Sequence, residues 1–167
     1  MKRAMSILLA CILMLAWCAL GEETEPLQLR IFVYDRCGGC GADGPGCGNC
    51  DEIGRLHGIV KETLGDRLYD GSMLYTMPNC RVLVVLEEYK QYCKDFGVYD
   101  ELYGYYPAAF ILRPDGSGVF AVGEEMLTSL GEIIDAFERG DSTEEIQKWV
   151  DDRRAEVYND TEMDGTA

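Results

Sequence analysis

The sequence predicts an α/β fold, in which short strands alternate with amphipathic helices. Residues 27–34, LQLRIFVY, place apolar side chains alternately on one face, as a strand entering a core does. Residues 51–64 repeat apolar side chains at three- and four-residue spacing, which predicts a helix that starts at the last cysteine of a glycine-rich loop. Residues 108–113 and 118–122 flank the turn sequence 114–117, PDGS, and predict a β-hairpin.

The remaining segments predict one more strand and three helices. Residues 81–86, RVLVVL, form a continuous aliphatic run, which predicts a strand covered on both faces in a parallel arrangement. Residues 87–96 and 124–138 each gather apolar side chains on one helical face. A last helix opens with Ser142 and Glu145, which have the spacing of a capping box.

The N-terminus predicts an export signal. Lys2 and Arg3 precede an uncharged apolar run that ends in small residues, so residues 1–21 are interpreted as a signal peptide, with an uncleaved membrane anchor as the alternative. We therefore expect a secreted or otherwise extracytoplasmic protein. An uncleaved signal or a lipid anchor would be its only attachment to a membrane.

The remainder of the chain is long enough for one domain with a core of its own. We expect a short linker at residues 22–26, the domain at residues 27–158, and a disordered acidic tail at residues 159–167. The formal net charge of −15 would repel nucleic-acid phosphates and anionic membrane surfaces. Nucleic-acid binding is therefore not expected.

The loop RCGGCGADGPGCGNCD, residues 36–51, contains two Cys-x-x-Cys pairs. An exported chain favours disulfides, but sequence alone does not choose the pairing. Because a thiol reacts as the thiolate, and the positive end of a helix lowers its pKa, the helix start selects Cys47 and Cys50 as the reactive pair. Cys37 and Cys40 would form a second exchanging pair or a fixed disulfide.

Two other uses of these four cysteines stay open. They supply the thiolates of a zinc site, or they form a structural disulfide knot, and either would make the chain a non-catalytic binding module. Outside the loop, Cys80 and Cys93 are expected to be buried free thiols. His57 is expected to be a partly buried packing residue, with a proton shuttle as the alternative.

The order of elements resembles the thioredoxin-like fold over residues 27–138. In that family a Cys-x-x-Cys lies between the first core strand and the next helix, and a cis-proline loop precedes a hairpin opposite it. Pro107, in the stretch Tyr106-Pro107-Ala108, stands at the place of that proline. The resemblance implies a three-layer sandwich with a central mixed sheet and flanking helices, to which this chain adds a C-terminal helix.

The resemblance also implies a thiol–disulfide oxidoreductase that acts on protein thiols and disulfides outside the cytoplasm, without an organic cofactor. Cys47 would be the nucleophile and Cys50 the resolving thiol, while Tyr106 and Pro107 would contact the substrate. The chain departs from the family pattern in its doubled pair. A ten-residue offset separates the pair that follows the strand from the pair that opens the helix.

Overall fold

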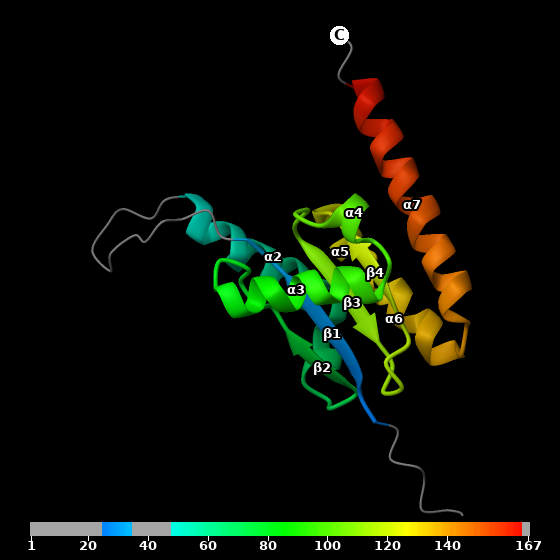
Figure 1. Ribbon diagram of the computed structural model, residues 1–167. Coiled ribbons are helices and arrows are strands. Elements are labelled where there is room, and N and C mark those ends of the chain that lie inside the picture. The colour runs from blue at the N-terminus through cyan, green and yellow to red at the C-terminus, as the bar shows by residue number, and fades with distance from the viewer. Residues whose placement is uncertain (1–24, 35–47, 165–167) are drawn as a thin grey trace, which may run out of the picture.

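A four-stranded mixed sheet with the strand order β2-β1-β3-β4 forms the centre of the structure (Figure 1). The computed structural model describes residues 25–34 and 48–164, with side chains described for residues 25–34 and 53–157. β1 is parallel to β2 and antiparallel to β3, and β3 is antiparallel to β4. The strands are β1 (Leu27–Phe32), β2 (Met73–Thr76), β3 (Ala108–Leu112) and β4 (Gly118–Val122).

Helices cover both faces of this sheet, which confirms the predicted α/β sandwich with a mixed sheet and flanking helices. One face packs against α2 (Gly48–Leu64), α5 (Glu124–Leu127) and α6 (Leu130–Arg139). The other packs against α3 (Leu83–Asp95) and α4 (Tyr99–Leu102). The short 3₁₀ helix η1 (Gly65–Leu68) follows α2, and the extra C-terminal helix α7 (Thr143–Asp164) packs beside β4 and α6.

The two faces of the sheet carry different cores, because successive side chains of a strand point to opposite faces. In β1, Leu29 and Ile31 point into an aliphatic core shared with α2 and α6. Phe32 points into an aromatic core under α3, where its ring lies 5.0 Å from the ring of Tyr89 and 5.8 Å from that of Phe110.

The predicted strand at residues 81–86 is wrong. α3 begins at Leu83, and the side chains of Leu83 and Val84 are 71% and 72% exposed. The helix predicted at residues 87–96 thus begins one turn earlier, because Val85 and Leu86 also pack against the aromatic core. The strand beside β1 is instead β2, a four-residue segment in which only Met73 is fully buried.

The hairpin and the capping box are confirmed. β3 and β4 pair through residues 108–112 and 118–122, and the turn between them places Gly116 at a φ of 84°. At the start of α7, the hydroxyl of Ser142 accepts a hydrogen bond from the backbone N–H of Glu145 at 3.3 Å. The Glu145 carboxylate accepts one from the backbone N–H of Ser142 at 3.2 Å.

One predicted helix is divided in the structure, and the last helix is longer than the predicted domain. The segment 124–138 forms two helices, α5 and α6, separated by Thr128 and Ser129. Its apolar face is nevertheless buried as predicted: Met126, Leu127, Leu130, Ile133, Ile134 and Phe137. α7 continues to Asp164, six residues beyond the predicted end of the domain at 158. The predicted signal peptide, residues 1–21, lies outside the described residues.

Candidate functional site around the cis-proline loop

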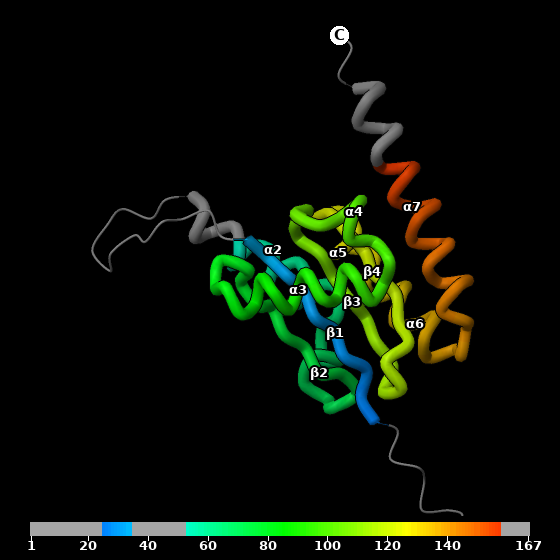
Figure 2. The backbone as a smooth tube through the Cα atoms, in the orientation of Figure 1, coloured from blue at the N-terminus to red at the C-terminus, as the bar shows by residue number. Residues whose placement is uncertain are grey.

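The segment that carries the two Cys-x-x-Cys pairs joins β1 to α2. Figure 2 shows that the end of β1 and the part of α2 that follows residue 52 lie at the same end of the sheet. Cys50 is the third residue of α2, so its backbone is part of the first helical turn. Cys37, Cys40 and Cys47 lie outside the described residues.

The peptide bond between Tyr106 and Pro107 is cis, as the sequence predicted. Pro107 is buried at the start of β3 and helps to line a small cavity of about 20 Å³ between the end of β1 and α2. The residues around this cavity are Val33, Tyr34, Ile53, Leu56, Tyr106 and Pro107. Position 53 lies three residues after position 50, so the two positions share one side of α2. The proline loop therefore faces the part of α2 that follows the last cysteine.

Tyrosines hold the proline loop in place. The Tyr89 hydroxyl of α3 lies 2.9 Å from the backbone carbonyl of Tyr105 and 3.1 Å from that of Leu102, and can donate to either. The ring of Tyr106 lies 5.2 Å from the ring of Tyr89 and 5.5 Å from that of Tyr34. Tyr89 is fully buried, so the loop is anchored to the aromatic core.

Cys80 and Cys93 are buried free thiols, which confirms the expectation from sequence. Burial raises the pKa of Cys80 to about 11, although a hydrogen bond from Tyr106 opposes that shift. Burial also raises the pKa of Cys93, against a hydrogen bond from Tyr89. Both side chains are therefore neutral thiols near pH 7, which is the unreactive form.

The backbone of Cys80 is joined to the end of β1. Its N–H donates to the carbonyl of Val33 at 2.8 Å, and the N–H of Val33 donates to the carbonyl of Pro78 at 3.1 Å. The segment that leads into α3 is thus joined to the end of β1, where the cysteine loop departs. The sequence did not predict this connection, because the hydrogen bonds form only when β1 and residues 78–80 lie side by side.

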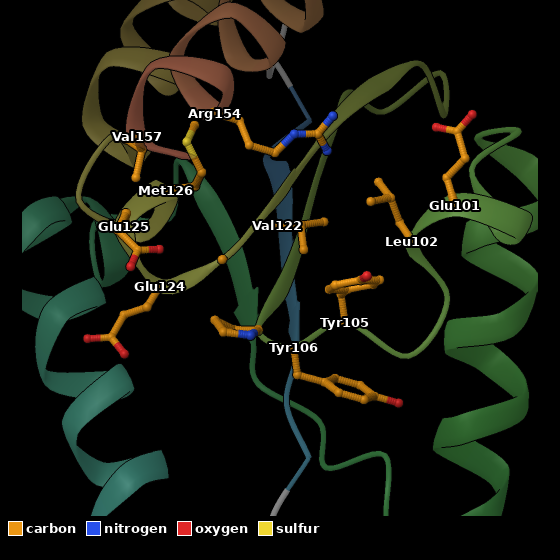
Figure 3. Close-up of a pocket in the computed structure, with 12 residues that line it drawn as sticks. Glu101, Leu102, Tyr105, Tyr106, Val122, Glu124, Glu125, Met126, Arg154 and Val157 are labelled. Atoms are coloured by element: carbon orange, nitrogen blue, oxygen red, sulfur yellow. The ribbon is translucent and has the colours of Figure 1, made fainter. Parts of the chain in front are cut away.

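A larger pocket of about 610 Å³ also has Tyr106 and Pro107 in its lining (Figure 3). Its walls come from α4, from the loop before β3, from the junction of β4 and α5, and from α7. The backbone N–H of Gly123 donates to the carbonyl of Pro107 at 3.0 Å, which joins two of these walls. Sequence reasoning found Tyr106 and Pro107 but not the contribution of α7.

The surroundings of His57 differ from the expectation. Its side chain is exposed rather than partly buried, and its Nδ1 atom lies 3.0 Å from the hydroxyl of Tyr75 in β2. The two rings stack with centroids 5.7 Å apart. Burial raises the pKa of Tyr75 to about 12, so its phenol stays protonated near neutral pH. His57 therefore joins α2 to the edge strand β2.

Among the residues with described side chains, no group of three or more His, Cys, Asp and Glu residues is arranged to hold a metal ion. Within the same part of the chain, no helix has both the length and the apolar character needed to cross a bilayer. Comparison of the sequence with known protein families and curated proteins, and of the chain with solved structures, finds no match.

Proposed function

We propose that this protein is an extracytoplasmic thiol–disulfide oxidoreductase of the thioredoxin-like family that acts on disulfides of other proteins. One observation carries the proposal: the Tyr106–Pro107 loop packs against α2 just after Cys50, which lies in the first turn of this helix. The mixed sheet with flanking helices is compatible with that family. Cys47 and Cys50 are the proposed reactive pair.

The proposed reaction is two successive thiol–disulfide exchanges. The Cys47 thiolate attacks one sulfur of a substrate disulfide, which forms a mixed disulfide and releases the other substrate sulfur as a thiolate. The Cys50 thiolate then attacks the sulfur of Cys47, which forms the Cys47–Cys50 disulfide and releases the second substrate thiolate. The substrate gains two electrons and the protein loses two, which an external dithiol restores. Cys37 and Cys40 are a second exchanging pair or a fixed disulfide.

The electrostatic setting of the two groups of cysteines supports this choice. Cys47 precedes the first residue of α2 and Cys50 lies in its first turn, where unpaired backbone N–H groups stabilise a thiolate. Burial has the opposite effect on Cys80 and Cys93, whose pKa values it raises. The proposed substrate contacts, Tyr106 and Pro107, follow both groups of cysteines in the sequence, and the fold brings them next to α2.

The test is the reduction of a protein disulfide with dithiothreitol as the final reductant. We expect Cys47→Ser to lower kcat/KM by at least about 100-fold, because the attacking thiolate is lost. Cys80→Ala is the matched control, since it removes a thiol of raised pKa, and it should retain most of the activity. Circular dichroism of each variant checks that the fold is kept.

Three results would contradict the proposal. Activity that survives in Cys47→Ser and disappears in Cys37→Ser would assign the reaction to the other pair. A wild-type protein that reduces no disulfide, and that holds one zinc ion whose removal unfolds the chain, would be a non-catalytic zinc module instead. A wild-type protein without activity, zinc or titratable thiols in the loop would point to a structural disulfide knot.

A further inference from the structure

The pocket beside Pro107 combines an apolar lining with a charged rim. Leu102, Val122, Met126 and Val157 contribute apolar side chains, and four charged side chains stand around them: Glu101, Glu124, Glu125 and Arg154. A lining of this kind suits a long side chain whose methylene stem is apolar and whose end is charged. The pocket volume, about 610 Å³, is in the range of sites that bind small ligands and side chains.

The ion pairs at the rim of the pocket determine whether it favours a positively or a negatively charged ligand. Both carboxylate oxygens of Glu124 bond to the guanidinium of Arg55, which neutralises that acid and lowers its pKa. The guanidinium of Arg154 lies 3.6 Å from the carboxylate of Asp151, one turn earlier on α7.

The other two rim acids are not compensated in this way. Glu101 and Glu125 lie on opposite sides of the pocket in Figure 3. Neither forms an ion pair with a residue whose side chain the structure describes. The rim therefore has an excess of negative charge, and the net charge of −15 extends this field to approaching molecules.

The pocket is joined to the proposed reaction site. The hydrogen bond from the N–H of Gly123 to the carbonyl of Pro107 fixes the pocket wall to the proline loop, and Pro107 also packs toward α2. A substrate that reaches across Pro107 to the start of α2 would thus place neighbouring residues in this pocket. α7 closes its far side with Arg154 and Val157.

We propose that this pocket binds a lysine or arginine side chain of the protein substrate, close in sequence to the cysteine that reacts. This inference rests on the proposed oxidoreductase function, and it adds a substrate class: disulfides in cationic segments. The carboxylate of Glu101 or that of Glu125 receives the cationic head, while the apolar lining contacts the stem.

The experiment compares three peptides that share one disulfide and differ only at the residues flanking one cysteine, which are lysine, glutamine or glutamate. Dithiothreitol is the final reductant. We expect kcat/KM for the lysine peptide to exceed that for the glutamate peptide by about 10-fold or more at low salt, and the ratio to shrink as salt is added. The double variant Glu101→Gln/Glu125→Gln should lower the ratio by about 5-fold.

A charge-matched control separates the pocket from the overall charge of the protein. Glu62→Gln/Glu144→Gln removes two exposed acids that do not line the pocket, so the lysine-to-glutamate ratio should stay at the wild-type value. An equal fall of the ratio in both double variants would overturn the pocket and assign the preference to the general field. Turnover without any charge preference would overturn it as well.

A separate binding measurement tests the pocket independently of the proposed disulfide reduction. The same peptides with serine in place of cysteine carry no disulfide, and fluorescence anisotropy of labelled peptides measures their affinity directly. Tighter binding of the lysine peptide, weakened by Glu101→Gln/Glu125→Gln, supports the pocket even if no disulfide is reduced, in which case only the oxidoreductase proposal fails. Equal affinities for the three serine peptides would refute the pocket.

Discussion

At the scale of single residues, Tyr89 links the aromatic core to the proline loop. Its side chain is fully buried, and its hydroxyl lies within hydrogen-bond distance of two backbone carbonyls of the segment that leads to Pro107. Removal of this hydroxyl leaves both carbonyls without that donor while the ring can still pack. Tyr89 is therefore a positioning residue for the loop rather than a group that touches substrate.

We predict that Tyr89→Phe lowers the free energy of unfolding by about 1–2 kcal/mol, because the hydrogen bond of a hydroxyl on a fully buried side chain is lost. Urea denaturation measures this change, and Tyr69→Phe, at a side chain that is 69% exposed, is the control with little expected effect. Tyr89→Phe should also raise the KM for protein disulfides. Unchanged stability together with an unchanged KM would show that the hydroxyl does not position the loop.

Cys80 predicts a loss of stability in alkaline solution. Burial raises its pKa from 9.0 to about 11, so the folded state holds the thiol proton more tightly than the unfolded state does. This contribution is complete below about pH 9 and is lost as the pH rises from about 9 to 11, with a slope of up to about 1.4 kcal/mol per pH unit. The reduced protein should therefore unfold more easily at pH 10 than at pH 8.

The measurement is urea denaturation of the wild type and of Cys80→Ala at both pH values, with the reductant present. We expect the wild type to lose about 1 kcal/mol more than the variant between pH 8 and pH 10, since only the wild type has this thiol. Other titrating groups are common to both proteins and cancel in the comparison. Parallel pH dependences would mean that Cys80 ionises alike in the folded and unfolded chains.

At the scale of elements, α7 covers the free edge of the sheet. β4 is an edge strand, and the side-chain amide of Gln147 bonds to both outward backbone groups of Phe120. The N–H of Phe120 donates to Oε1 at 2.9 Å, and Nε2 donates to the carbonyl of Phe120 at 3.1 Å. An unpaired edge would offer these groups to another chain. The side chain of a helix thus replaces a neighbouring strand.

We predict that Gln147→Ala lowers the free energy of unfolding by about 1–3 kcal/mol, because the buried N–H and carbonyl of Phe120 lose their partners. The control is Lys148→Ala, the next residue of α7, whose exposed ion pair with Asp152 should contribute less than about 1 kcal/mol. Both are measured by urea denaturation. If the free energy of unfolding falls equally in the two variants, the contact between Gln147 and Phe120 contributes no more to stability than an exposed ion pair.

The elements also show where local patterns suffice. The hairpin turn and the capping box are determined by residues within a few positions of one another, and both were predicted correctly. Residues 81–86 have the composition of a buried strand, yet Leu83 and Val84 are exposed in the first turn of α3. Their structure follows from Val85 and Leu86 packing on a sheet that no local pattern reveals.

At the scale of the whole molecule, the order of elements predicted the sandwich and the cis-proline more reliably than any single segment did. β2 was missed because it is short and lies at an edge, with Leu74 57% exposed, so its apolar signal is weak. Of the candidate site, Tyr106 and Pro107 were predicted from the family resemblance as substrate contacts, and the structure places both in the pocket lining. The pocket itself was not predicted, since Glu101, Glu125 and Arg154 meet only when α4, α5 and α7 are assembled.

The separation of the two cores has an optical consequence. Within the ranges that the structure describes, Trp149 is the one tryptophan, and on α7 it lines the same shallow pocket as Ala136 of α6. The aromatic core on the opposite face of the sheet has tyrosine and phenylalanine in its place. Tryptophan fluorescence will therefore follow the release of α7, while near-ultraviolet circular dichroism of the tyrosines follows mainly α3 and the proline loop, where most of the buried tyrosines lie. Followed together during unfolding, the two signals compare the rate at which α7 detaches with the rate at which the aromatic core is lost, and neither needs an added label.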